Sequence, residues 1–148
     1  LHSDNPLVAQ LIQILKDHDE YAYQFALRTN KMNHFITHFE DYNIPFVGPI
    51  AGSRKRPDGS NLEWKMLFPA TEGQQVQPFL IEWGKTKNIP ADRRLINRKQ
   101  IPSLTLKQEA LEDFKHIYQI PTSDHQIKLE NGTLSFINQK ELFKLKVD

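Results

Sequence analysis

The sequence of 148 residues contains no cysteine. Disulfide bonds and thiolate-bound metal sites are therefore excluded, and we expect a reducing location such as the cytoplasm. Long apolar runs are also missing, so we expect neither a membrane-spanning segment nor a membrane partner. The chain opens on Leu1 rather than methionine, so we expect it to be a fragment of a longer protein. We expect no secretory leader in it.

Charge of one sign is equally scarce, since the net charge is only +1. A broad basic field is absent, so we expect no nucleic-acid partner. The sequence also lacks a nucleophile elbow, a phosphate-cradling glycine loop and a dinucleotide fingerprint. These absences disfavour serine hydrolases, nucleotide hydrolases and Rossmann oxidoreductases.

What the first part of the chain does contain is clear apolar periodicity. It predicts a helix over 6–16, a strand over 21–29 and a second helix over 31–41. Three strands are then predicted over 46–53, 62–68 and 79–84, with turn signals between them. The predicted order is strand, helix, strand, strand, strand.

A polar linker follows, and after it the same order returns in smaller form. The domain boundaries predicted are an N-terminal helix (1–18), a first βαβββ module (19–84), a linker (85–99) and a smaller second module (100–148). Shifting the numbering by about 76 superposes several identical residues of the two halves, which favours a duplicated module. The predicted elements of the second module are strands at 103–106, 126–129, 133–137 and 142–147 and a helix at 107–118.

Four segments of the first module carry a family resemblance: Ala26–Thr29, Arg54–Gly59, Leu62–Trp64 and Pro78–Gly84. In order and spacing they resemble the glyoxalase-like domain of the vicinal oxygen chelate (glyoxalase/bleomycin resistance/dioxygenase) superfamily, over roughly residues 5–84. The resemblance implies an α+β fold of βαβββ modules, with a mixed curved sheet that forms a cup and helices on the outside.

The resemblance also implies chemistry. In that superfamily a divalent metal such as zinc, nickel, iron or manganese often sits in the cup, held by His, Gln or Glu of the first and last strands of each module. Glu82 falls on such a last strand, and is the expected metal ligand and catalytic residue. The family's preceding module, with its early His, has no counterpart in this chain. We therefore expect pairing with an upstream module or in a homodimer.

The residues themselves give an orientation for Glu82. It alternates with Phe79, Ile81 and Trp83, so those three are expected to face the helices while Glu82 faces the cup. Gln24 and Arg28 are expected on the cup face of the first strand, where small neighbours leave room for a ligand. An alternative is that Arg28 simply forms a salt bridge with Glu82.

The remaining candidates each keep two readings. Arg54 and Arg56 either clamp a carboxylate or phosphate group or form a solvated hairpin tip. Trp64 packs in the core or, if the strand faces are reversed, lines the cup and stacks on a flat ligand. His34 and His38 have the spacing of a zinc pair, but we expect ordinary half-exposed histidines.

Two functions follow from these expectations. The first is a glyoxalase-like protein that binds a small polar molecule in a sheet-lined cup, with metal-assisted lyase, isomerase or dioxygenase-type chemistry. The second is a metal-free module that binds or sequesters a small molecule, its pocket lined by Gln24, Arg28, Trp64 and Glu82.

Overall fold

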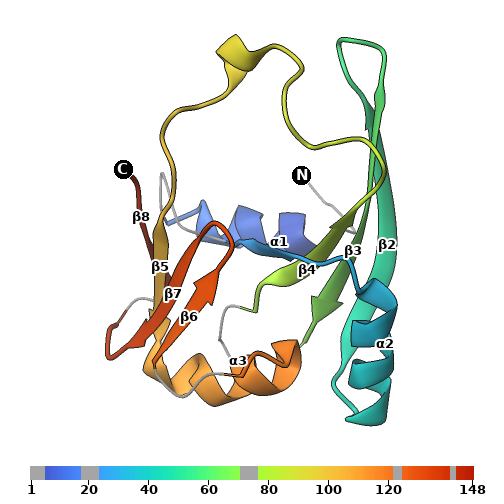
Figure 1. Cartoon of the computed structure of the whole chain (residues 1–148). Coiled ribbons are helices and arrows are strands. Elements are labelled where there is room, and N and C mark those ends of the chain that lie inside the picture. Colours follow the sequence, from blue (N-terminus) through green and yellow to red (C-terminus); the bar gives the residue numbers. More distant parts are fainter. Residues whose placement is uncertain (1–5, 18–23, 71–76, 122–124, 141–142) are drawn as a thin grey trace.

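A computed structural model describes residues 6–17, 24–70, 77–121, 125–140 and 143–148. It confirms the predicted α+β class: two four-stranded mixed sheets stand side by side, with helices against them (Figure 1). The elements of the first half are α1 (Pro6–Ile14), β1 (Ala26–Arg28), α2 (Met32–Asp41), β2 (Phe46–Lys55), β3 (Asn61–Pro69) and β4 (Phe79–Trp83).

The elements of the second half also follow the predicted order. They are the 3₁₀ turn η1 (Arg93–Leu95), β5 (Ser103–Lys107), the 3₁₀ turn η2 (Gln108–Ala110), α3 (Leu111–Tyr118), β6 (Gln126–Leu129), β7 (Gly132–Ile137) and β8 (Phe143–Lys146). Residues 18–23, the start of the predicted first strand, lie outside the described residues.

The first sheet has the strand order β1-β4-β3-β2. Helix α2 is the crossover that allows β1 to pair in parallel with β4, while β2, β3 and β4 are joined by antiparallel pairing. A register shift interrupts β2 next to Gly48, whose φ is +114°. A Cβ at Gly48 would lie 2.6 Å from the carbonyl oxygen of Met66, so the close strand approach requires glycine there.

The second sheet repeats the element order but has a different strand order, β6-β7-β5-β8. Strand β5 lies inside the sheet, parallel to β7 and antiparallel to β8. Its counterpart in the first half, β1, lies at the sheet edge. The second half is therefore similar to the first in its order along the chain and distinct in how its strands pair.

One continuous core joins the two halves. Phe39 of α2 and Phe114 and Ile117 of α3 are almost fully buried in the same apolar cluster. Between the helices, His38 is buried, with Nε2 donating to the carbonyl oxygen of His116 (2.8 Å) and Nδ1 2.8 Å from the side-chain amide of Gln119. The expectation of a half-exposed residue is wrong for His38, which cross-links α2 and α3.

Strand register defines which side chains share a face of the first sheet. Leu67 and Leu80 are paired across β3 and β4 and belong to the buried cluster with Phe39, so their face is covered by α2. The opposite face, which we call the aromatic face, carries Leu62, Trp64, Met66, Phe68, Phe79, Ile81 and Trp83, of which Leu62 and Ile81 are buried. We refer to the face opposite α2 as the inner face.

This assignment corrects the predicted orientation. Phe79, Ile81 and Trp83 were expected to face the helices, and they lie on the face opposite α2. The apolar pattern alone misleads because both faces of β3 and β4 carry large apolar side chains, so alternation does not say which one a helix covers.

Candidate functional site

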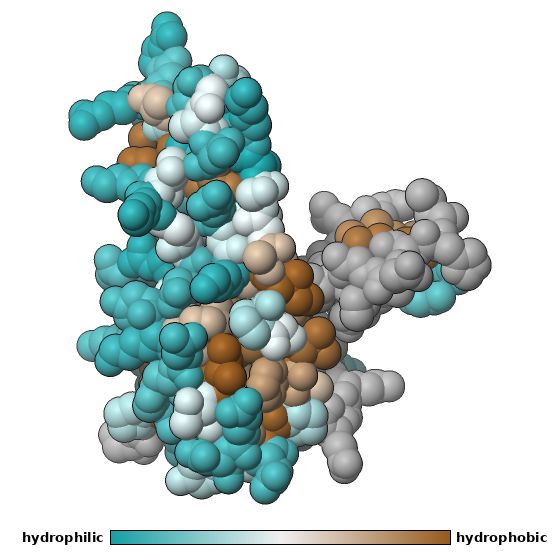
Figure 2. All heavy atoms as spheres, turned by 90° about the vertical axis from the view of Figure 1, so that its right-hand side faces the viewer, coloured by the Kyte–Doolittle hydropathy of each residue, from teal (hydrophilic) through white to brown (hydrophobic). Residues whose placement is uncertain are grey.

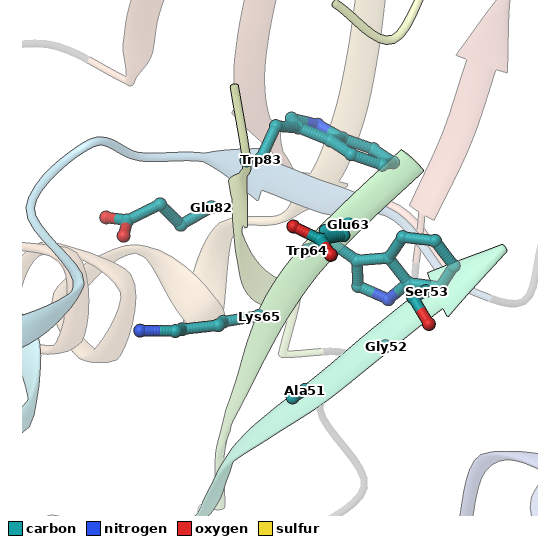
Figure 3. A pocket seen from close by; sticks show the side chains of 9 residues that line it. Ala51, Gly52, Ser53, Glu63, Trp64, Lys65, Glu82 and Trp83 are labelled. Carbon is teal, nitrogen blue, oxygen red and sulfur yellow. The ribbon is translucent and has the colours of Figure 1, made fainter. Parts of the chain in front are cut away.

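Glu82 lies on the α2 side of the sheet, so its predicted orientation into the cup is wrong. Its register partner across β3 is Lys65, and both side chains point toward the start of α2 (Figure 3). The Oε2 atom of Glu82 accepts a hydrogen bond from the backbone N–H of Met32, at 3.0 Å. The first N–H groups of a helix have no partner within it and carry partial positive charge, which a carboxylate satisfies.

The start of α2 has a second such partner from the preceding loop. The hydroxyl oxygen of Thr29 accepts a hydrogen bond from the backbone N–H of Lys31, at 3.0 Å. Together, Thr29 and Glu82 satisfy two successive N–H groups, which gives Glu82 a structural role. Its predicted roles as metal ligand and catalytic residue stay predictions.

Aromatic pairs dominate the inner face. The rings of Trp64 and Trp83 are cross-strand partners with centroids 5.7 Å apart, and those of Phe68 and Phe79 are stacked at 5.1 Å. These four side chains are half-buried and stand outside the buried cluster. The second reading of Trp64, in which it lies on the cup face, is the one that matches its position.

A hollow of about 500 Å³ lies where β2, β3 and β4 run beside one another at Trp64, and by strand register most of its lining, including Glu63, Lys65 and Glu82, is on the α2 side. Its lining comes from three adjacent strands and the residue after β4: Ala51, Gly52, Ser53, Glu63, Trp64, Lys65, Glu82, Trp83 and Gly84. In Figure 3 the indole rings of Trp64 and Trp83 project to one side, whereas Glu82 and Lys65 project to the other. The indole of Trp64 lies over Gly52, where a Cβ would approach it to 2.5 Å.

Arg28 shares the inner face, since its register partner is Ile81. It does not pair with Glu82. Its Nη2 atom lies 2.5 Å from Oε2 of Glu130, on the turn between β6 and β7, and both side chains are largely exposed, at 65% and 81%. The alternative reading, an Arg28–Glu82 salt bridge, is wrong, because Arg28 instead links the two sheets through Glu130.

Gln24 is engaged with its own surroundings. Its Nε2 atom donates to the carbonyl oxygen of Gln77 at 3.2 Å, and its Oε1 atom accepts from the N–H of Phe25. The hollow that it lines, of about 270 Å³, lies between β1 and the second sheet. Gln24 and Trp64 therefore line different hollows.

Arg54 and Arg56 are at the tip of the β2–β3 hairpin. Arg54 is exposed, whereas Arg56 is half-buried and donates from Nη2 to the carbonyl oxygen of Lys87. In the same turn the N–H and hydroxyl of Ser60 donate to Asp58, which lowers the pKa of that carboxyl group. Arg56 lines a separate hollow against the 85–99 segment. The structure thus distributes the predicted ligand-binding residues over several hollows.

The described residues do not fit a divalent metal. Within residues 6–17, 24–70, 77–121, 125–140 and 143–148, no three His, Asp or Glu side chains are grouped as a metal site requires. Glu82 has an amine-bearing side chain, Lys65, as its cross-strand neighbour rather than a second oxygen or imidazole donor.

Sequence reasoning missed Trp83 as a residue of the inner face. The signal that finds it is the pairing of Leu67 with Leu80: once this pair is assigned to the helix side, Trp64 and Trp83 must both face inward. Lys87 and Arg93, which line the hollow beside Arg56, were missed because the 85–99 segment looked like a plain linker.

No helix among the described residues is long and apolar enough to cross a membrane.

Comparison with known proteins identifies the family and the fold of this chain. The model of a glyoxalase-like domain family matches residues 3–121. Among solved structures, a hypothetical protein from Staphylococcus aureus is similar in fold, with a TM-score of 0.65 at 17% sequence identity. The alignment covers 93% of this chain and 62% of that protein. No curated protein matches significantly. On the family match, this chain belongs to the glyoxalase-like domain family.

Proposed function

We propose that this chain binds a small molecule with a flat apolar body and an anionic group on the inner face of its first sheet. The observation that carries the proposal is the pair Trp64 and Trp83, whose rings stand together on that face and outside the buried core. Indole rings offer large flat contact area at little conformational cost, which suits them to stacking on a flat ligand.

Arg28 is the proposed polar partner of this site, and it lines a neighbouring hollow of about 530 Å³ together with Glu130. It lies on the same face, and Trp83 is two residues beyond its register partner Ile81 along β4, a separation of about 7 Å. Its ion pair with Glu130 is exposed on both sides, and such pairs contribute little free energy. A ligand carboxylate can therefore replace Glu130 as the partner of the guanidinium group at small cost.

The proposed function is binding or sequestration without a metal, the second of the two functions predicted from the sequence. It requires only groups present in the described residues. Metal-assisted chemistry of the lyase, isomerase or dioxygenase type would need donors other than the described ones, for example from an upstream module or a second copy facing the cup. Either pairing would also cover a ligand bound to the aromatic face. We propose that the protein works in a reducing compartment such as the cytoplasm.

Nuclear magnetic resonance gives a direct test, because the sequence contains only two tryptophans. A ¹⁵N–¹H spectrum thus has two indole Nε1–H peaks, and both report on this site. We expect both to shift saturably on titration with 2-naphthoate. Cyclohexanecarboxylate, which has the same charge and no flat ring, should bind about two- to tenfold more weakly if stacking supplies about 0.5–1.5 kcal/mol.

Matched variants separate the two parts of the site. Arg28→Gln should weaken binding of 2-naphthoate, whereas Glu130→Gln should strengthen it because the guanidinium loses its competitor. Trp83→Leu should remove the preference for the flat ring. The proposal is rejected if both indole peaks stay in place at saturating 2-naphthoate or if the two acids bind equally well.

A metal readout tests the alternative on the same sample. Titration with Zn²⁺ or Mn²⁺ that shifts the resonances around Glu82, and that Glu82→Gln abolishes, would favour the metal-assisted function instead. Binding of 2-naphthoate that is unchanged by a chelator would favour the metal-free module.

A further inference from the structure

The positive charge of this chain is concentrated at one end of the molecule. Residues 54–58 and 85–99 contain nine of the 19 Lys and Arg residues and two of the 18 Asp and Glu residues. These 20 residues thus carry a charge of +7 in a chain whose total is +1. The remaining 128 residues are correspondingly acidic, so the concentration is not a property of the whole surface.

The fold brings these two segments together. The hairpin between β2 and β3 and the long connection from β4 to β5 both reach the upper end of the molecule in Figure 1. The same end is mostly hydrophilic in Figure 2, with a few hydrophobic side chains among the hydrophilic ones, whereas hydrophobic side chains gather in the lower half of that view. The hydrogen bond from Arg56 to the carbonyl oxygen of Lys87 joins the segments directly.

A hollow of about 380 Å³ lies between them. The hairpin contributes Arg56, Asp58 and Ser60, and the connection contributes Thr86, Lys87 and Arg93 among its polar side chains. Ile89, Pro90 and Ile96 form apolar parts of the same wall. The volume matches a small molecule, and the polar lining combines two guanidinium groups, an ammonium group, two hydroxyls and the carboxylate of Asp58.

The hollow is lined by three cations, Arg56, Lys87 and Arg93, and by one carboxylate, that of Asp58, whose charge interacts with that of Arg56. Asp58 accepts two hydrogen bonds from Ser60, at 2.9 and 2.6 Å. Asp92 is engaged by the guanidinium group of Arg94, which lies outside the hollow and lowers the pKa of that carboxyl group. Arg56 is half-buried, and one of its donors is held by the carbonyl oxygen of Lys87, which keeps its guanidinium group in place.

From this cluster we infer a second ligand site, for a small molecule with a doubly charged oxyanion, between Arg56, Lys87 and Arg93. Guanidinium forks and an ammonium group are the donors that recognise phosphate and carboxylate oxygens, and charge-assisted hydrogen bonds are stronger than neutral ones. The apolar wall of Ile89, Pro90 and Ile96 accommodates a short hydrocarbon part of the ligand. This site is separate from the inner face of the first sheet.

The probes are inorganic pyrophosphate and succinate, titrated by calorimetry and by ¹⁵N–¹H spectra of the intact chain. We expect saturable binding at one site, with shifts at the backbone amides of 56–60 and 86–96. Tighter binding of pyrophosphate would assign the site to phosphate compounds, and tighter binding of succinate to dicarboxylates. The two indole peaks of Trp64 and Trp83 should not move, which keeps this result independent of the proposed function.

Variants that each remove one positive charge, inside or outside the hollow, distinguish a defined binding site from a diffuse basic surface. Arg93→Gln and Arg56→Gln should each weaken binding about tenfold, the loss expected for one charge-assisted hydrogen bond. Arg98→Gln removes the same charge from the same connection outside the hollow, and should change affinity less than twofold. Arg93 is exposed, so its variant stays folded even if Arg56→Gln disturbs the connection.

Two results would overturn the inference. One is the absence of saturable binding of both probes at low ionic strength. The other is equal weakening by Arg93→Gln and Arg98→Gln, which would mean that the segments form a general polyanion-attracting surface with no defined site.

Discussion

The two sheets of this molecule differ in how their faces are used. In the second sheet, short strands pack Leu106, Ile127, Leu134 and Phe136 against α3, and these side chains are almost completely buried. In the first sheet, longer strands bury Leu67 and Leu80 under α2 but leave the four aromatic side chains of the inner face half-buried. The second sheet therefore mainly stabilises the fold, whereas the first also offers a surface on which a ligand can bind.

The largest expected effect tests this division of roles. Phe114→Ala should lower the free energy of unfolding by about 3–5 kcal/mol, since it removes a fully buried ring of the shared core. Trp83→Ala removes a larger side chain but should cost only about 1–2 kcal/mol, because the indole is half-buried. Urea unfolding of both variants measures the two values, and equal losses would contradict the distinction between the sheets.

Next comes the contact between the two halves made by Tyr118. Its hydroxyl donates to the carbonyl oxygen of Pro78 at 2.5 Å, in a buried position. Tyr118→Phe should therefore lower the free energy of unfolding by about 1–3 kcal/mol, because the carbonyl group is left without this partner. Tyr42→Phe, at an exposed tyrosine of α2, is the control and should be nearly neutral.

The same tyrosine predicts a dependence on pH. Burial raises the pKa of Tyr118 well above its ordinary value, because the phenolate form is poorly solvated inside the protein. Above a pH of about 10 the unfolded chain loses this proton while the folded chain keeps it, so stability falls as pH rises. The contribution is fully present below that pH. The free energy of unfolding, measured at several pH values between about 8 and 11, should fall less steeply with pH for Tyr118→Phe than for the unsubstituted chain.

Gly52→Ala sharpens the comparison at the inner face itself. The added Cβ would lie 2.5 Å from the indole of Trp64, so the ring must move. We expect a loss of about 1–3 kcal/mol in stability from overpacking and a weaker preference for 2-naphthoate. The Nε1–H peak of Trp64 should shift even without ligand. An unchanged indole spectrum would show that the ring does not lie over Gly52.

The smallest effect concerns the bridge between the sheets. Arg28→Gln should change the free energy of unfolding by at most about 1 kcal/mol, since both partners of the Arg28–Glu130 pair are largely exposed. Thermal unfolding at low and high salt checks this value. A larger loss would mean that the ion pair, rather than the shared core, holds the two halves together.

Much of the fold could be predicted from the sequence because it depends on local pattern. The α2 helix was expected over 31–41 and is found at Met32–Asp41, and every described strand lies within a few residues of its predicted range. Those predictions rest on apolar periodicity and turn residues, which a single sequence contains. The strand order of the second sheet does not follow from such local signals, because it depends on which strands find each other in space.

The site was harder to predict for the same reason. The face to which Glu82 points depends on which side of the sheet α2 covers, and β3 and β4 have large apolar side chains on both sides. The residue type suggested a metal ligand, whereas the contact with the N–H of Met32 is tertiary. Lys87 and Arg93 meet Arg56 only because the connection folds back against the hairpin.

The central claim is that the inner face of the first sheet, rather than the side that holds Glu82, receives a ligand. Intermolecular nuclear Overhauser effects between 2-naphthoate and the protein measure this directly. We predict contacts from the naphthyl protons to the indole protons of both Trp64 and Trp83. Contacts confined to Lys65, Glu82 and the start of α2 would contradict the account.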